Sequence, residues 1–146
     1  MNKIILLVGD SGSGKDFVLS VANEYESIEV VKRYISRNPR NGEENSISSI
    51  FSTPIDEIKK LDYYYEGAEN GRWYGIRKTD LDKVLTIGKS PIVVCPNYQN
   101  MLKMLEDYQG NVVPYFIYRG YADEELEKWR ESLVSRGSSL EEIDAR

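Results

Sequence analysis

Residues 3–15 read KIILLVGDSGSGK, and this stretch decides the fold. The apolar run 4–8 leads directly into the glycine-rich segment GDSGSGK at 9–15. Apolar side chains at helical spacing follow, among them Val18 and Val21. A buried strand, a G-x-x-x-x-G-K loop and a helix in this order are typical of phosphate-binding loops in α/β proteins. The sequence therefore predicts a parallel α/β sheet with a polyphosphate bound where the first strand ends.

The loop at 9–15 has the composition that phosphate binding requires. Glycines allow the backbone to wrap a polyphosphate with its N–H groups, and the positive end of the following helix points at the same anion. Lys15 adds a point charge for the β- and γ-phosphates. A glycine- and serine-rich turn without a ligand is the alternative, but the strand, the spacing, the lysine and the helix together favour a nucleotide site. The residues expected at the phosphates of ATP are Gly9, Asp10, Ser11, Gly12, Ser13, Gly14, Lys15 and Asp16.

The residue after the lysine departs from the usual pattern, in which Ser or Thr supplies a hydroxyl ligand to Mg²⁺. This chain has Asp16 there. A carboxylate suits Mg²⁺ directly or through water, but it would repel a phosphate if no metal lay between them. We therefore expect Mg²⁺ with ATP as the cofactor and Asp16 as the metal ligand.

Length and composition indicate a single globular domain. The chain has 146 residues, of which 40% are hydrophobic and 29% charged. The formal net charge of −5 disfavours nucleic acid as a partner. The chain has one cysteine and no histidine, so it can form no internal disulfide and has no imidazole chemistry. The first apolar run is too short to span a bilayer, so we expect a core strand, no membrane partner and a cytoplasmic location.

Strand and helix patterns alternate along the chain, which favours a parallel sheet covered by helices. Asn70-Gly71 between two short strand patterns predicts a hairpin, and Thr53 and Asn97 are expected to cap helices. The polar residues 33–49 are expected to form a functional loop rather than a core element. Strands are expected at about 4–8, 28–31, 63–66, 72–76, 91–95 and 112–118, and helices at about 15–25, 54–61, 79–87, 98–109, 123–136 and from 139 onward.

These patterns predict a three-layer α/β fold of the P-loop NTPase class with a parallel sheet and a small inserted β-rich lobe. A single domain at 1–146 would have its core at 1–32 and 77–146, with the lobe at about 33–76. We expect the lobe to lie over the carboxyl edge of the sheet, where ligands bind in such folds.

Three further segments can be compared with known sequence motifs once the phosphate loop is identified. Residues 34–43, YISRNPRNGE, resemble the T-T-R-x-P-R-x-G-E segment of guanylate kinases, and residues 71–75, GRWYG, resemble their G-N-Y-Y-G segment. The triplet RGS at 136–138, followed by EE at 141–142 and by Arg146, resembles the R-G-T…E-E…R stretch of their lid. The four blocks match in order and approximate spacing over nearly the whole chain. The chain is thus similar to the guanylate kinase-like family within the P-loop nucleoside monophosphate kinases.

The resemblance implies a site for the phosphate of a nucleoside monophosphate, GMP by default, in the inserted lobe. In the family, arginines at the positions of Arg37 and Arg40 bind this phosphate. Ser36 matches a hydroxyl residue that assists them, and Tyr74 matches a tyrosine that also contacts the phosphate. Glu66 lies one residue from alignment with the glutamate that pairs with the guanine edge. Two guanidinium groups three residues apart can hold a phosphate by bidentate hydrogen bonds, although such a segment alone would be interpreted as a solvated basic loop.

Phosphoryl transfer depends on positioning and on neutralising charge more than on a general base. The resemblance identifies Arg136 and Arg146 as arginines of a partial lid at about 130–146. We therefore expect Lys15, Arg37, Arg136 and Arg146 to be the catalytic residues.

Several departures from the family pattern leave the acceptor open. Ser49 stands in place of a second phosphate-binding tyrosine, and Ile76 in place of a hydroxyl residue. Residues 94–99, VCPNYQ, stand where the family has L-D-I-D-x-Q, so both aspartates are missing, one of which contacts guanine and assists metal placement. Loss of a buried polar contact can change selectivity by several orders of magnitude, which argues against simple GMP specificity. Asn97 or Gln99 is the candidate replacement.

We therefore expect an enzyme that transfers the γ-phosphoryl group of ATP to a small phosphorylated acceptor, GMP by default or another such as a ribose phosphate. The alternative is a non-catalytic guanylate kinase-like module that binds a nucleotide or a phospho-ligand. Such modules typically lose the phosphate loop, which this chain keeps. A nucleotide-dependent switch without a small acceptor has no positive support in the sequence, and the oligomeric state is left open.

Overall fold

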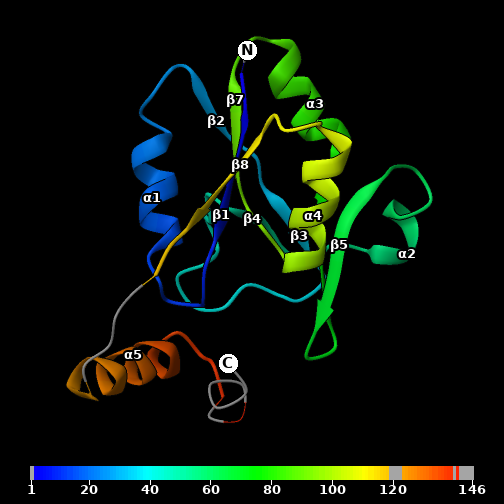
Figure 1. The fold of residues 1–146 in the computed structure, drawn as a ribbon. Coiled ribbons are helices and arrows are strands. Elements are labelled where there is room, and N and C mark those ends of the chain that lie inside the picture. The colour runs from blue at the N-terminus through cyan, green and yellow to red at the C-terminus, as the bar shows by residue number, and fades with distance from the viewer. Residues whose placement is uncertain (1, 119–122, 140, 142–146) are drawn as a thin grey trace.

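The computed structural model describes residues 2–118, 123–139 and 141, in which strands and helices alternate (Figure 1). The strands are β1 (Ile4–Val8), β2 (Ile28–Val30), β3 (Arg33–Ile35), β4 (Ser49–Ile50), β5 (Tyr64–Glu69), β6 (Arg72–Arg77), β7 (Ser90–Val94) and β8 (Val112–Phe116). The helices are α1 (Lys15–Ala22), α2 (Ile55–Ile58), α3 (Lys78–Thr86), α4 (Tyr98–Asp107) and α5 (Asp123–Ser135).

A parallel four-stranded sheet of order β2-β7-β1-β8 forms the centre of the molecule. Helix α1 covers one face, and α3 and α4 cover the other (Figure 1). Successive side chains of β1 point to opposite faces, so Leu7 packs with Leu19 of α1 while Leu6 packs with Leu81 and Met104 of the other layer. The predicted three-layer α/β fold with a parallel sheet is confirmed.

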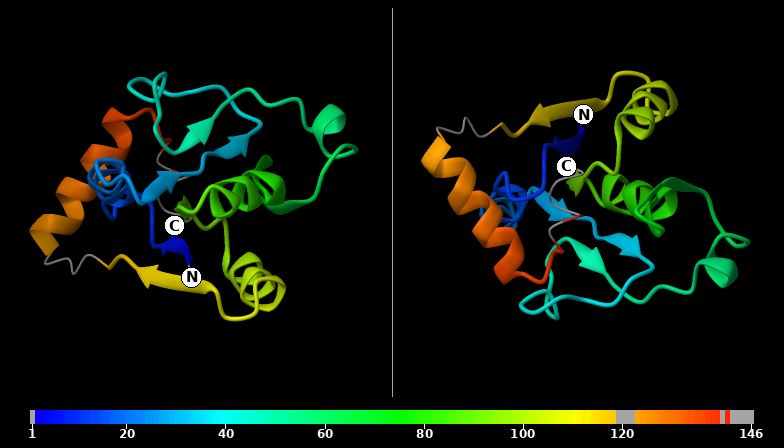
Figure 2. Two further views of the ribbon diagram at one scale, coloured as in Figure 1. Left: turned by 90° about the horizontal axis from the view of Figure 1, so that it is seen from above. Right: turned by 90° about the horizontal axis from the view of Figure 1, so that it is seen from below.

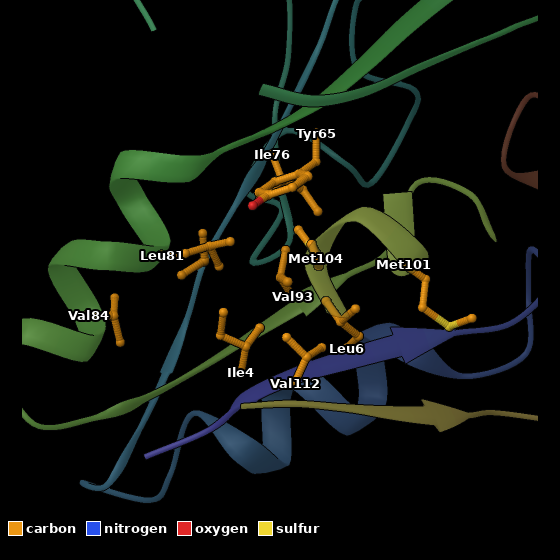
Figure 3. Packing of buried hydrophobic residues seen from close by; sticks show 11 residues of the cluster. Ile4, Leu6, Tyr65, Ile76, Leu81, Val84, Val93, Met101, Met104 and Val112 are labelled. Atoms are coloured by element: carbon orange, nitrogen blue, oxygen red, sulfur yellow. The ribbon is translucent and has the colours of Figure 1, made fainter. Parts of the chain in front are cut away.

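A second, mixed sheet of order β4-β3-β6-β5 forms the β-rich part of the chain. Tyr65 of β5 and Ile76 of β6 are fully buried and pack against Leu81 and Met104 (Figure 3). The apolar face of this hairpin therefore anchors the second sheet to α3 and α4, on the same side of the central sheet.

The prediction of a loop throughout 33–49 is wrong at both ends of the segment. Arg33 pairs with Ser49 in a short parallel ladder, and β3 also pairs with β6. Ile35 is fully buried, which fixes β3 against the core. Strands β3 and β4 have only three and two residues, which is too few to show an alternating pattern in the sequence. They form because they pair with each other and, for β3, with β6, and these partners are distant in the chain.

The turn and cap predictions had different outcomes. Asn70 and Gly71 both have positive φ, 51° and 71°, as a two-residue hairpin turn requires. The side chain of Asn97 accepts a hydrogen bond from the Asn100 N–H at 2.9 Å and caps α4. Thr53 does not cap α2, because its hydroxyl donates to the Ile50 carbonyl and its own N–H donates to Ile35.

Helix α5 lies beyond the carboxyl end of β1, beside the loop that joins β1 to α1 (Figures 1 and 2). The expected final helix from 139 onward lies almost entirely outside the described residues. Within the described ranges, no helix is both long enough and apolar enough to pass through a lipid bilayer.

Candidate active site

A pocket of about 360 Å³ opens where β1 and β7 end, at the edge of the sheet where parallel α/β folds bind ligands. Its walls come from the loop at 9–15, the segment after β3, the β5–β6 hairpin and the end of α5. The charged lining residues are Lys15, Arg33, Arg37, Arg40 and Arg136 against Asp16, Glu43 and Glu69. Cationic groups outnumber carboxylates here although the whole chain has a net charge of −5, so the lining is suited to an anionic ligand.

The loop between β1 and α1 has the tight geometry of a phosphate cradle. A Cβ at Gly9 would lie 2.5 Å from the Ile117 carbonyl oxygen, so the backbone just after β8 can approach this closely only to a glycine. Gly12 has φ +77°, in the left-handed region that favours glycine. Lys15 Nζ donates to the carbonyl oxygens of Gly9 at 2.6 Å and Asp10 at 2.5 Å. The lysine is therefore held across the mouth of the loop, at the wall of the pocket.

Asp16 lies in the first turn of α1, is exposed and lines the pocket. Among the described residues, no group of three or more acidic, cysteine or histidine side chains could hold a metal by itself. Mg²⁺ is usually bound by one or two carboxylates together with substrate phosphates and water, so an exposed carboxylate directly after the loop at 9–15 fits it. The donor set is thus compatible with Mg²⁺ arriving on a polyphosphate.

Arg37 follows β3 and is held in place by Glu43. Its two terminal nitrogens donate to the two carboxylate oxygens at 2.7 and 3.1 Å, and the guanidinium lies 4.9 Å from the Phe51 ring centroid. Burial alone would lower the pKa of Arg37, but the hydrogen bonds to Glu43 raise it overall. Burial likewise would raise the pKa of Glu43, which the hydrogen bonds from Arg37 and from the Arg40 N–H hold below its ordinary value. Both groups therefore stay charged, and the guanidinium is fixed before any ligand binds.

The other expected acceptor residues divide between the pocket and its support. Arg40 and Tyr74 line the pocket with Arg37. Ser36 lies outside the lining, where its hydroxyl accepts a hydrogen bond from the Trp73 N–H at 2.9 Å. Ser36 therefore ties β6, which carries Tyr74, to the arginine segment.

The structure does not bring Glu66 into this pocket. In the β5–β6 ladder Glu66 pairs with Gly75 while Gly67 pairs with Tyr74, so Glu66 and Tyr74 point to opposite faces of the sheet. The Glu66 carboxylate instead accepts from Trp73 Nε1 and pairs with Lys59 at 2.8 Å. Glu69 lies on the same face as Tyr74 and is the carboxylate of this strand that lines the pocket.

The side-chain amides of Asn97 and Asn100, after β7, form hydrogen bonds within the protein. Asn97 caps α4, and Asn100 donates to the Asn97 side chain at 2.8 Å and to the Glu66 carbonyl oxygen at 2.7 Å. Val94 and Pro96 are the residues of this segment that line the pocket. Among the lining residues that the structure describes, the two side chains from this segment are apolar and offer no hydrogen bond to a nucleobase.

Helix α5 closes the pocket from the side of the phosphate loop. Trp129 Nε1 donates to the Ser11 carbonyl oxygen at 2.7 Å. Arg136 lines the pocket, and its terminal nitrogen lies 3.4 Å from where a Cβ would stand at Gly12. Leu133 and Ser138 are buried at the same place. Arg136 is thus beside the phosphate loop, whereas Arg146 lies outside the described residues.

Four residues at this site had no role assigned from the sequence: Arg33, Glu43, Glu69 and Trp129. Glu43 was within the quoted arginine segment, where its spacing of three from Arg40 is that of a turn. Arg33 precedes Arg37 by four residues, a spacing that keeps both side chains on one side of an extended chain. For Glu69 and Trp129 the signal is absent, because hairpin register and the docking of α5 decide their positions.

The fold and the pocket define an α/β protein that has the guanylate kinase fold and a glycine-rich loop with the sequence pattern of phosphate-binding loops. The crystal structure of guanylate kinase from Anaplasma phagocytophilum matches with a TM-score of 0.66 and 20% identity, over 92% of this chain and 67% of that one. No family model matches the sequence.

Curated sequences extend the comparison. The guanylate kinase of Clostridium perfringens (strain SM101) is 27% identical over 143 residues, which cover 95% of this chain and 63% of the relative. That of Francisella tularensis subsp. holarctica is 29% identical over 153 residues, covering 99% of this chain and 78% of the relative. The chain is a distant homologue of the guanylate kinases and spans a little under two thirds of the length of the Clostridium relative.

Proposed function

We propose that the chain transfers the γ-phosphoryl group of ATP to a small phosphorylated acceptor, with GMP the default acceptor by similarity to its relatives. The observation that carries the proposal is that Lys15 of the phosphate loop and the Arg37–Arg40 pair line one pocket. A donor phosphate on the loop and an acceptor phosphate on the arginines would share that space. Each group has the geometry to bind an anion, and phosphoryl transfer needs them side by side.

The proposed roles follow from position. The backbone N–H groups at 9–15 hold the donor phosphates, and Lys15 exchanges its loop carbonyls for phosphate oxygens. Asp16 would hold Mg²⁺, which when bound neutralises charge on the donor phosphates. Arg37, fixed by Glu43, orients the acceptor phosphate. Arg136 approaches the loop from α5 and would offset the charge that develops on the transferred group.

The lobe and the lid complete the proposal. We assign acceptor binding to the lobe at about 33–76, donor binding to the core at 1–32 and 77–146, and water exclusion to the partial lid at about 130–146. Burial of Leu133 and Ser138 against the pocket supports the lid assignment. The proposed partners are ATP and the acceptor, in the cytoplasm, without nucleic acid or membrane.

A second acceptor class is favoured by one observation. Asn97 and Asn100 bond to each other, Asn100 also bonds to the backbone of β5, and neither residue lines the pocket. The wall of Val94 and Pro96 suits a sugar or another small group as well as a purine. The proposal is therefore a kinase of small phosphates, in which GMP and ribose phosphates are the first acceptors to compare.

A coupled ADP-release assay with Mg-ATP tests the proposal. The panel comprises GMP, dGMP, AMP, CMP, UMP and ribose phosphates, each compared with the rate without acceptor. Stimulation by at least one acceptor, lost in Lys15→Ala and kept in the control Lys32→Ala, is the expected result, since Lys32 is exposed and outside the pocket lining. Binding of ATP without stimulation by any acceptor would overturn the kinase and favour a non-catalytic nucleotide-binding module.

A further inference from the structure

We propose that Arg33 binds a second anionic group of the acceptor, so that the preferred acceptor carries another acidic group, such as a second phosphate, besides the one on Arg37 and Arg40. The inference deepens the proposed function and rests on it, because it takes the ligand beside Arg37 and Arg40 to be the phosphoryl acceptor. Its physical basis is an arginine in the pocket wall that lacks a carboxylate partner among the described residues.

The position of Arg33 is fixed by its surroundings. It begins β3, where it pairs with Ser49 of β4. Its Nε donates to Ser49 Oγ at 3.3 Å, and its guanidinium carbon lies 5.5 Å from the Tyr74 ring centroid. The hydrogen bond and the ring hold the planar group in the pocket wall, and no group of the described residues accepts a hydrogen bond from its terminal nitrogens.

The electrostatic surroundings of Arg33 also belong to the pocket. Burial lowers the pKa of Arg33, and the charged and phenolic groups that act on it are Tyr74, Asp16, Arg37 and Glu43, all lining residues. An arginine remains charged even when its pKa falls. Across the described ranges no carboxylate lies within ion-pair distance of it, because Glu43 is bonded to Arg37 and Asp16 acts only from farther away. A partly buried cation without a paired acid is stabilised when an anion binds beside it.

The guanidinium group needs a partner that presents hydrogen-bond acceptors. Arginine offers only donors, and acceptors are presented by phosphate and carboxylate groups and by N7 and O6 of guanine, so the ligand pairs of the test separate these cases. Oxygen atoms of a phosphate or carboxylate match the guanidinium fork. Arg33 begins β3 and Arg37 lies in the bend after it, and the two guanidinium groups rest on different partners: Ser49 and Tyr74 for Arg33, Glu43 and Phe51 for Arg37. Tyr74 lies between them, in contact with Arg33 and acting on Arg37.

The test is isothermal titration calorimetry of the full chain with matched ligands that differ by one phosphate. The pairs are GMP with guanosine 3′,5′-bisphosphate, and a pentose 5-phosphate with the corresponding pentose 1,5-bisphosphate. We expect at least one bisphosphate to bind about tenfold or more tightly than its monophosphate, because a charge-assisted pair adds that much affinity. Arg33→Met should remove this preference and change monophosphate affinity less than about threefold, and Arg33→Lys should keep part of it. Lys32→Met, which removes a neighbouring exposed charge, is the matched control.

Two results would overturn the inference: equal binding of mono- and bisphosphates by the unmodified chain, or an equal loss of both in Arg33→Met. Thermal unfolding of each variant shows whether it is folded, and Arg33→Lys replaces Arg33→Met if the latter is not. Calorimetry measures binding and needs no turnover. If no acceptor stimulated ADP release, the kinase proposal would fail, and the calorimetric comparison of mono- and bisphosphates would still decide whether Arg33 binds a second anionic group.

Discussion

Glu43→Gln is the perturbation that best tests how the acceptor site is built. The carboxylate accepts from both terminal nitrogens of Arg37, at 2.7 and 3.1 Å, and from the Arg40 N–H at 2.9 Å. Glutamine keeps the shape but can accept only one of the two guanidinium bonds, and its amide hydrogens face the other. Arg37 is then left in a site where its side chain is 15% exposed, without an opposite charge.

The expected loss can be worked from these contacts. A hydrogen bond between charged groups contributes about 1.5–3 kcal/mol, and partial exposure of Glu43 reduces this, so we expect a loss of about 1–2 kcal/mol of unfolding free energy. For a domain of this size the melting temperature should fall by about 3–8 °C. Because Arg37 is no longer fixed, the KM for the acceptor should rise about tenfold, while kcat changes less.

Differential scanning calorimetry and acceptor-dependent ADP release measure the two effects. The matched control is Glu44→Gln, which removes the same charge one residue later from an exposed side chain. If Glu43→Gln and Glu44→Gln gave the same melting temperature and the same KM, the account of Arg37 as a pre-positioned phosphate ligand would be refuted.

Three further predictions concern the titration of Glu43, the cap of α4 and the glycine at position 12. The pKa of Glu43 is lowered in the folded chain. Its ionised carboxylate therefore stabilises the fold above its unfolded pKa of about 4.3, and this stabilisation is lost as the pH falls through the lower folded pKa. The difference in unfolding free energy between the unmodified chain and Glu43→Gln, measured by urea unfolding, should shrink below about pH 4. Asn97→Ala removes the cap of α4 and should lower the unfolding free energy by about 1 kcal/mol, whereas Gln99→Ala in the same helix should have a smaller effect in the same titration. Gly12→Ala places a Cβ at positive φ and 2.7 Å from Trp129 Nε1, so ATP binding measured by calorimetry should weaken about tenfold or more; unchanged affinity would contradict the proposed loop geometry.

The first strand, the loop and helix that follow it, and the hairpin turn could be predicted because local signals decide them. The apolar run of β1 ends at Val8, directly before the glycines, and the helix pattern restarts at Lys15. Asn70-Gly71 fixed the hairpin because positive φ at two successive residues favours those residue types. In each case the controlling interaction lies within a few residues along the chain.

The composition of the site was harder to predict, because distant pairing decides it. Glu66 and Glu69 are both acidic residues of β5, and only the register with β6 shows that Glu69 shares a face with Tyr74. An alignment gap of one residue reverses that face, since side chains of a strand alternate. Arg33 was missed because a basic run is usually exposed, and pairing with β4 places it in the pocket wall instead. The contact of Trp129 with Ser11 joins residues 118 apart in sequence, which no local pattern reveals.

The central claim is that donor and acceptor phosphates meet in one pocket, and Arg37→Ala tests it most directly. ADP release should be measured with and without the best acceptor, in the unmodified chain, in Arg37→Ala and in the exposed-charge control Lys32→Ala. We expect Arg37→Ala to lose acceptor stimulation by about tenfold or more while ATP affinity stays within about twofold, because Arg37 contacts the acceptor side of the pocket alone. Full stimulation in Arg37→Ala, equal to that in Lys32→Ala, would contradict the acceptor site.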